Sequence, residues 1–135
     1  MDSLKITRTQ HSKLKEVDFN NLGFGNTFSD HMLVCDYKHG QWGKAEILPF
    51  QSISLMPSAK IFHYGQSIFE GMKAYKDHDE NTWLFRPEEN FKRLNKSAKR
   101  LAIPELPKAV FFEGMKALLK LDNAWIPNAP GSSLY

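Results

Sequence analysis

Residues 87–102 read PEENFKRLNKSAKRLA, and this stretch predicts the most regular helix of the chain. Pro87 suits a first helical turn, and Glu88 and Glu89 suit the positive end of the helix dipole. The apolar residues recur at helical spacing and form one stripe: Phe91, Leu94, Ala98, Leu101 and Ala102. A second helix with a comparable stripe is predicted from about Pro107 to Asp122.

The segments before these helices have the character of strands. The predicted strands are residues 27–37, 45–55, 72–76 and 82–85, joined in pairs by turns that contain glycine or polar residues. Pro49 lacks a backbone N–H, so its strand is expected to lie at a sheet edge or to be interrupted there. Between the two pairs, residues 61–71 begin extended and are predicted to end in a short helix at Gly71.

The order of the elements, strands first and helices after, predicts an α+β fold. Two helices would pack on one face of a largely antiparallel sheet. Residues 1–23 are polar and weakly patterned, and we expect them to form an N-terminal arm. Residues 24–135 would then form the folded domain.

Composition excludes several classes of protein. No apolar run in the 135 residues approaches the length of a membrane-spanning helix, so no membrane partner is expected. A net charge of +3 without a nucleic-acid motif argues against nucleic-acid binding. Cys35 is the one cysteine, which excludes an internal disulfide and favours a reducing, cytoplasmic setting. The histidines lack metal-ligand spacing, so no metal site is expected.

Two residues are candidates for binding on residue chemistry alone. Arg93 shares a helix face with Ser97 and Arg100, away from the apolar stripe. That face is either a solvated surface or an anion site, in which the planar guanidinium of Arg93 donates paired hydrogen bonds to a phosphate or carboxylate. Tyr64 follows an extended segment at a corner of the chain, where its hydroxyl either points into a cleft or is satisfied in the core.

Four segments together resemble the branched-chain amino-acid aminotransferases. These are FGNTFSDHML at 24–33, HYGQSIFEGMKAY at 63–75, FRP at 85–87 leading to RLNKSA at 93–98, and SSLY at 132–135. They follow one another at the spacing of that family and span nearly all of the chain from Phe24 onward. Several ordered motifs are a more specific signal than any one of them alone.

The resemblance implies the fold-type IV architecture, in which a small domain and a larger domain hold pyridoxal phosphate between them. This chain would be the incomplete small domain of a homo-oligomeric enzyme. Arg93 matches the arginine that binds the cofactor phosphate, and Tyr64, Phe24 and Tyr135 match residues of the substrate pocket. The implied reaction transfers the amino group of leucine, isoleucine or valine to 2-oxoglutarate, which gives glutamate and a branched 2-oxo acid.

The resemblance also implies that the cofactor-holding lysine lies beyond Tyr135. Lys73 is the best candidate within the chain, but a strand lysine that faces solvent lacks the desolvation that such a role requires. We therefore assign no catalytic residue and expect the chain to be inactive alone. Because the sheet would lack its later strands, we also expect self-association through an exposed edge or apolar surface.

Two rival interpretations remain open at this point. Another fold-type IV enzyme, such as a D-amino-acid aminotransferase or an aminodeoxychorismate lyase, shares the general pattern, although residues 24–33 favour the branched-chain group. The other rival is a naturally short, non-catalytic binding module.

Overall fold

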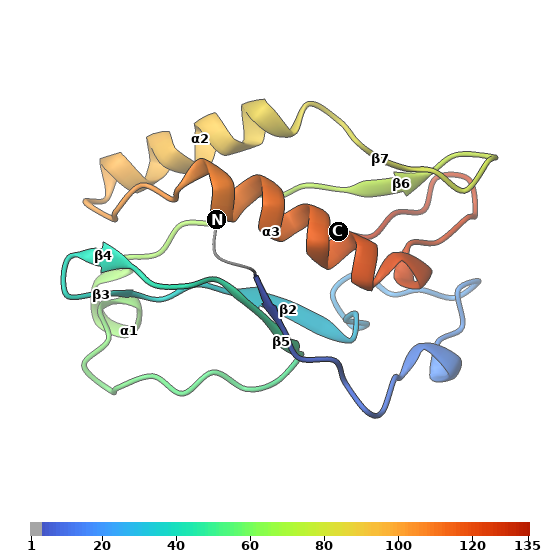
Figure 1. The fold of residues 1–135 in the computed structure, drawn as a ribbon, viewed down its shortest axis with the longest axis horizontal. Helices are drawn as coiled ribbons and strands as arrows, with labels where there is room; N and C mark the ends of the chain where they lie inside the picture. Colours follow the sequence, from blue (N-terminus) through green and yellow to red (C-terminus); the bar gives the residue numbers. More distant parts are fainter. Residues whose placement is uncertain (1–3) are drawn as a thin grey trace.

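The computed structural model describes residues 4–135 as two long helices stacked over small sheets. Helices α2 (Pro87–Arg100) and α3 (Lys108–Leu121) run across the molecule, and strands β2 (His31–Val34) and β5 (Glu46–Pro49) lie on the other side of α3 (Figure 1). The α+β class predicted from the sequence is confirmed. No helix within residues 4–135 has both the length and the apolar character needed to cross a membrane.

Strand pairing is mainly antiparallel, as predicted, but it is divided among three small sheets. In the largest sheet β5 is central, with β2 antiparallel on one side and β1 (Lys5–Ile6) parallel on the other. The N-terminal segment therefore contributes a strand to the sheet, and Met1–Ser3 lie outside the described residues.

The two hairpins form the other sheets. Strands β3 (Tyr37–Lys38) and β4 (Gln41–Trp42) pair around His39 and Gly40, both of which have positive φ angles, as a tight two-residue hairpin turn requires. Strands β6 (Ala74–Lys76) and β7 (Thr82–Leu84) pair in the second hairpin.

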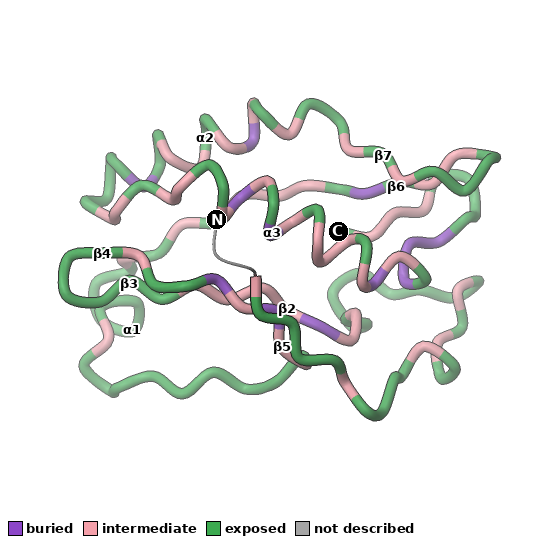
Figure 2. The backbone as a smooth tube through the Cα atoms, viewed as in Figure 1, coloured by how far each residue is buried: buried purple, intermediate pink, exposed green. Residues whose placement is uncertain are grey.

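Two predicted strands are much shorter in the structure. Of the strand predicted at residues 27–37, only β2 forms a continuous strand. Of the strand predicted at residues 45–55, only β5 does so. Pro49 is the last residue of β5, so the interruption predicted there is confirmed, although β5 is the central strand and not an edge. After Pro49 the chain leaves the sheet, and residues 50–58 are exposed almost throughout (Figure 2).

The core lies between α3 and the sheet. Ile47 of β5 is fully buried, and Phe111 of α3 and Ile126 are also buried. Ile126 follows a short 3-10 helix at Asn123–Trp125. Trp125 is fixed there by the hydrogen bond from its indole N–H to Asp30, which ties the end of α3 to the segment before β2.

The short helix is placed differently from the prediction. Helix α1 (Lys60–Tyr64) ends one residue before Gly65, which adopts a left-handed φ of 58°. The prediction that it ends at Gly71 was therefore wrong, because the earlier glycine already supplies the left-handed cap that stops the helix. Residues 66–73 then run without regular structure along α2 toward β6.

The β6–β7 turn is organised by one carboxylate. Asp77 accepts hydrogen bonds from the backbone N–H groups of Asp79 and Asn81 and from the indole N–H of Trp83, at 3.0, 2.8 and 2.6 Å. The hydrogen bond from Trp83 is the main reason that the pKa of Asp77 falls from 3.8 to about 2. The charged carboxylate therefore stabilises the turn.

Stability should fall at acid pH through this group. Because the folded-state pKa is depressed, the contribution of Asp77 is present above its ordinary pKa of 3.8 and is lost as the pH falls toward 2. The ordinary and folded-state pKa values of Asp77 correspond to about pH 4 and pH 2. Between these two pH values, we expect the urea midpoint of the D77N variant to fall less than that of the unaltered chain. The matched D79N variant, in the same turn with a side chain 68% exposed, should keep the original acid dependence. Parallel profiles for D77N and the unaltered chain would contradict the assignment.

Candidate functional site

Arg93 lies at the rim of a surface hollow of about 300 Å³. The hollow is bounded by α2, by the β6–β7 hairpin and by the segment that enters β6. Its lining residues include three cations and one carboxylate, namely Lys73, Arg86, Arg93 and Glu89, together with Tyr75, Asn90 and Tyr135. An excess of positive charge in an open hollow suits a small anion.

The guanidinium of Arg93 is held by a neighbouring carboxylate. Nε of Arg93 donates to Oε2 of Glu70 at 3.1 Å, and Nη2 donates to Oε1 at 2.6 Å. These hydrogen bonds hold the pKa of Glu70 below its usual range and raise that of Arg93. Among the hydrogen bonds of the described residues, Nη1 of Arg93 takes no part, so its two N–H groups remain available to a ligand.

Asn90 fixes the carboxylate in turn. Its side-chain N–H group donates to Oε1 of Glu70 at 3.0 Å and to the backbone oxygen of Gly71 at 2.9 Å. Asn90 is 7% exposed and precedes Arg93 by three residues, so both side chains leave α2 on the same face. This face of α2 is thereby tied to the irregular segment that contains Glu70 and Gly71.

Tyr135 and Phe24 meet at the same hollow. The ring of Tyr135 lies so close to Gly71 that a Cβ atom added there would be 2.6 Å from the tyrosine oxygen. The ring of Phe24 packs on that of Tyr135 with centroids 5.7 Å apart. Phe24 is 84% exposed, so the pair presents an apolar surface beside the hollow.

Tyr64 is placed elsewhere. It lies at the end of α1, is 81% exposed, and lines a second hollow with Lys60, Gln66 and Leu101. The side chain of Gln66 donates to the backbone oxygen of Leu101, so this hollow lies at the far end of α2 from Arg93. Leu101, which follows the last residue of α2, is eight positions after Arg93, which corresponds to about 12 Å along the helix axis.

The sequence led us to expect Arg93 and Tyr64 in one cleft. The described residues bring Arg93 and Tyr135 to one hollow, with Phe24 against Tyr135, and place Tyr64 at another. The irregular segment 66–73 passes from one hollow to the other. Tyr64 is not buried in the core, so its side chain is accessible to a ligand or to further protein.

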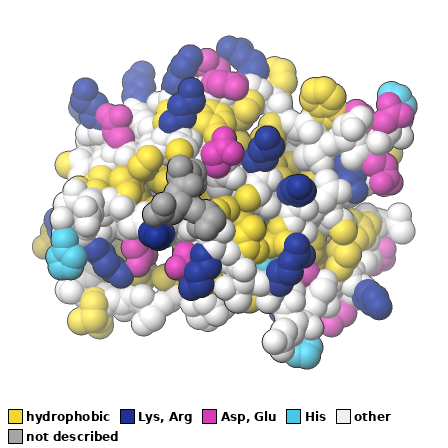
Figure 3. Space-filling view, in the orientation of Figure 1, with side chains coloured by type: hydrophobic (Ala, Val, Ile, Leu, Met, Phe, Trp, Pro, Cys, Tyr) yellow, Lys and Arg dark blue, Asp and Glu magenta, His cyan; other side chains and the backbone are white. Residues whose placement is uncertain are grey.

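Positive charge continues along the outside of α2. Lysine and arginine side chains gather at the edge of the molecule where α2 lies (Figure 3). Lys92 is paired there with Glu89 at 2.8 Å, an exposed contact between residues one helical turn apart. Such a pair contributes little stability, so the charged edge mainly adds to the field near Arg93.

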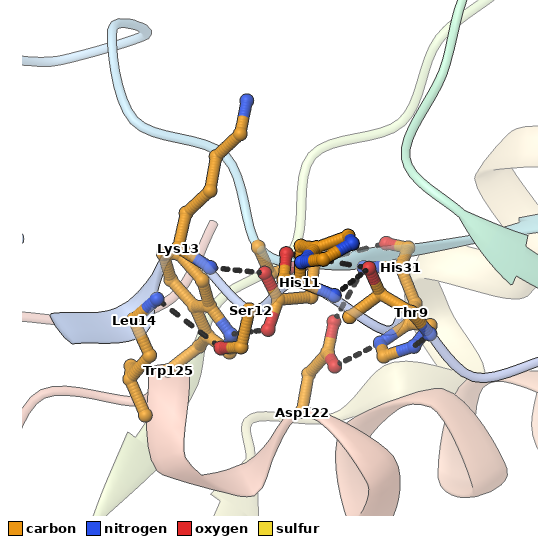
Figure 4. Close-up of polar contacts among 10 residues, drawn as sticks. Thr9, His11, Ser12, Lys13, Leu14, His31, Asp122 and Trp125 are labelled. Carbon is orange, nitrogen blue, oxygen red and sulfur yellow. Dashed lines mark hydrogen bonds and ion pairs between the residues drawn. The ribbon is translucent and has the colours of Figure 1, made fainter. Parts of the chain in front are cut away.

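The most buried polar cluster lies away from the hollows and has a structural role. Asp122, at the end of α3, binds both the backbone N–H and the ring Nδ1 of His31, at 3.0 and 2.6 Å (Figure 4). Ring Nε2 of His31 accepts the backbone N–H of Thr9 at 2.9 Å, so the ring proton lies on Nδ1. Asp30 accepts the indole N–H of Trp125 at 3.1 Å. These bonds join the N-terminal segment, β2 and the end of α3.

Residues 4–135 contain no group of histidine, cysteine or acidic side chains arranged to hold a metal ion. The hollow at Arg93 is therefore the best candidate for a functional site among the described residues. Its donors fit a phosphate or carboxylate, because a guanidinium pairs with either geometry and Arg93 retains free N–H groups.

Comparison with known proteins supplies the family. The chain is 46% identical over 134 residues to branched-chain-amino-acid aminotransferase 2 of Bacillus subtilis (strain 168), which covers 98% of the chain and 37% of that protein. It is 48% identical over 124 residues to the branched-chain-amino-acid aminotransferase of Mycolicibacterium smegmatis, which covers 90% of the chain and 34% of that protein. No family model matches.

The chain belongs to the branched-chain aminotransferase family. The resemblance stated from the motifs is confirmed, and the relatives are named as aminotransferases. The chain spans a little over a third of the length of the first of these relatives.

Sequence reasoning missed three residues of this candidate site. Glu70 and Asn90 hold Arg93, and Gly71 makes room for the ring of Tyr135. Asn90 carried a detectable signal, since it is one helical turn before Arg93 on the same face. Glu70 carried none, because its contact with Arg93 spans 23 positions of sequence.

Proposed function

We propose that this chain is the small-domain part of a pyridoxal-phosphate-dependent branched-chain aminotransferase. The full-length protein would transfer the amino group of leucine, isoleucine or valine to 2-oxoglutarate. The observation that carries this proposal is the identity of 44–48% to proteins of that name along 87–98% of the chain. The hollow supports it, because it is lined by Arg93, which the resemblance matches to the arginine that binds the cofactor phosphate.

The residues of the chain would bind and orient rather than carry out the chemistry. Arg93 would hold the phosphate through its free Nη1 group, with Arg86 and Lys73 adding positive potential. Phe24 and Tyr135 would form an apolar wall that excludes water from a branched side chain, and Tyr64 would complete the substrate pocket. The cofactor, when bound, supplies an electron sink for the substrate carbon that bears the amino group.

Lys73 does not suit the role of cofactor-holding lysine. It is exposed, just before β6, so it lacks the burial that would make its amine reactive at neutral pH. We therefore infer that this lysine belongs to another part of the full-length protein, which would act as a homo-oligomer. A cytoplasmic location is inferred from the lone Cys35, whose pKa is raised by burial and whose thiol is therefore unreactive.

The test is an amino-transfer assay. Full-length protein containing this chain, loaded with pyridoxal phosphate, should form glutamate from leucine and 2-oxoglutarate, whereas the 135-residue chain should show no turnover. A second assay with D-alanine as the amino donor distinguishes a branched-chain aminotransferase from a D-amino-acid aminotransferase, since only the latter is expected to use it. Transfer from D-alanine but not from leucine would refute the proposal, and turnover of leucine by the 135-residue chain would refute the inferred location of the lysine.

A further inference from the structure

The Arg93–Glu70 pair is unusual in how unequally its two members are exposed. The side chain of Glu70 is 12% exposed, whereas that of Arg93 is 61% exposed. The carboxylate therefore forms the inner, fixed half of the pair, and the guanidinium extends from it into the hollow. A surface ion pair formed by two flexible side chains would expose both of them.

The contacts of Glu70 limit the positions that the guanidinium can take. A planar guanidinium bound through Nε and Nη2 to both carboxylate oxygens has its orientation fixed, so the Nη1 group points in one direction. Asn90 prevents the carboxylate from rotating, because its amide also bonds to the backbone of Gly71. The carboxylate is thus anchored at two points before any ligand arrives.

The charges of the hollow remain suitable for an anion even with Glu70 counted. Lys73, Arg86 and Arg93 outweigh the carboxylates of Glu70 and Glu89 by one positive charge. The hydrogen bond from Arg93 holds the pKa of Glu70 below its usual range, so both members of the pair stay charged near neutral pH. Glu70 therefore uses part of the charge of Arg93 but leaves the site attractive to phosphate.

We propose that Glu70 is a positioning residue, which together with Asn90 sets the guanidinium of Arg93 in the orientation that binds the cofactor phosphate. This inference rests on the proposed function, because it assigns the anion as that phosphate. Binding is stronger when a flexible side chain is ordered beforehand, since the entropy of ordering arginine is no longer lost on binding. Glu70 supplies this order without touching the ligand.

The experiment measures the affinity of the full-length protein for two probes, pyridoxal 5′-phosphate and pyridoxal. The dissociation constant of pyridoxal divided by that of pyridoxal 5′-phosphate is the preference for the phosphorylated probe. This ratio reports the contribution of the phosphate alone. A variant that merely loosens the fold changes both constants together and leaves the ratio unchanged. The variants are E70A, E70Q, N90A and R93A, and the matched control is E88A, which removes an exposed carboxylate from the first turn of α2.

We expect E70A to lower the preference for the phosphorylated probe by about two- to tenfold, through lost preorganisation. N90A should act in the same direction, and E88A should have no effect. E70Q should also lower the preference, because one of the two oxygens that accept from Arg93 becomes an NH2 donor, which cannot pair with a guanidinium N–H. It serves as the test if E70A fails to fold.

The outcomes separate this inference from the proposed function. If R93A leaves the ratio unchanged, Arg93 does not bind the phosphate and the proposed role of the hollow fails with it. If R93A lowers the ratio but E70A and E70Q do not, only the positioning role of Glu70 is overturned. A higher preference for pyridoxal phosphate in E70A would also overturn it, because Glu70 would then compete with the phosphate for Arg93.

Discussion

Replacing Asp122 with alanine should lower the free energy of unfolding by about 2–6 kcal/mol, because it removes the acceptor of two buried hydrogen bonds. The side chains of Asp122 and His31 are 3% and 6% exposed. D122A would leave two buried donors of His31 without an acceptor, the backbone N–H and ring Nδ1. Each unsatisfied buried donor costs about 1–3 kcal/mol, and the two donors together give the range of about 2–6 kcal/mol.

Urea unfolding followed by far-UV circular dichroism would measure this effect. The matched control is E113A, which removes an exposed acidic side chain from α3 and should change stability by no more than about 0.5 kcal/mol. Because small domains are stable by only about 5–15 kcal/mol, D122A would remove a large share of the total. An unfolding midpoint for D122A equal to that of E113A would show that the Asp122–His31 contact does not hold the N-terminal segment and α3 together.

Replacing Gly114 with leucine should also destabilise the chain, by about 1–3 kcal/mol or more. Gly114 is buried in α3 where the helix packs on β2, and a Cβ atom added there would lie 2.6 Å from Cδ2 of Leu33. The additional leucine carbons would have to enter space that Leu33 already fills. The close approach of helix and strand explains a glycine in mid-helix, which otherwise destabilises a helix by about 1 kcal/mol relative to alanine.

The same contact supplies the controls. G114A adds only one methyl group, and the better helix propensity of alanine offsets part of the displacement of Leu33, so its effect should be much smaller than that of G114L. Shortening the opposing side chain in the double variant L33A/G114L should restore part of the stability lost in G114L. If the effects of L33A and G114L were simply additive, Leu33 would not be the side chain that limits residue 114.

The helices were predictable because their signals are local. Pro87, the two glutamates after it and the apolar stripe indicated α2 to within two residues, and α3 was predicted equally well. The β3–β4 turn was predictable because His39 and Gly40 lie in a short polar link that contains a glycine. The strands were less predictable, since pairing with a distant partner and not the strand sequence decides where each one ends.

The candidate site also contains some residues that local sequence could indicate and others that it could not. The local pattern placed Arg93 on a helix face away from the core, which could be a solvated surface or an anion site, and only the family resemblance favoured the anion site. It gave no indication of Glu70, which reaches Arg93 only through the path of residues 66–73, or of the close contact between Gly71 and Tyr135. The sequence also led us to expect Tyr64 and Arg93 in one cleft, and the structure places Tyr64 at the end of α1, on a hollow that Leu101 also lines, about two turns of α2 from Arg93.

The sequence by itself determined the α+β class, the two long helices and membership of the branched-chain aminotransferase family. Each depends on residue types at fixed local spacing, and this spacing can be recognised without knowledge of the folded chain. Only the tertiary structure decided which side chains meet: Asp122 with His31, Gly114 with Leu33, and Glu70 with Arg93. These contacts join positions between 23 and 91 residues apart, and no local preference of the backbone encodes such a distance.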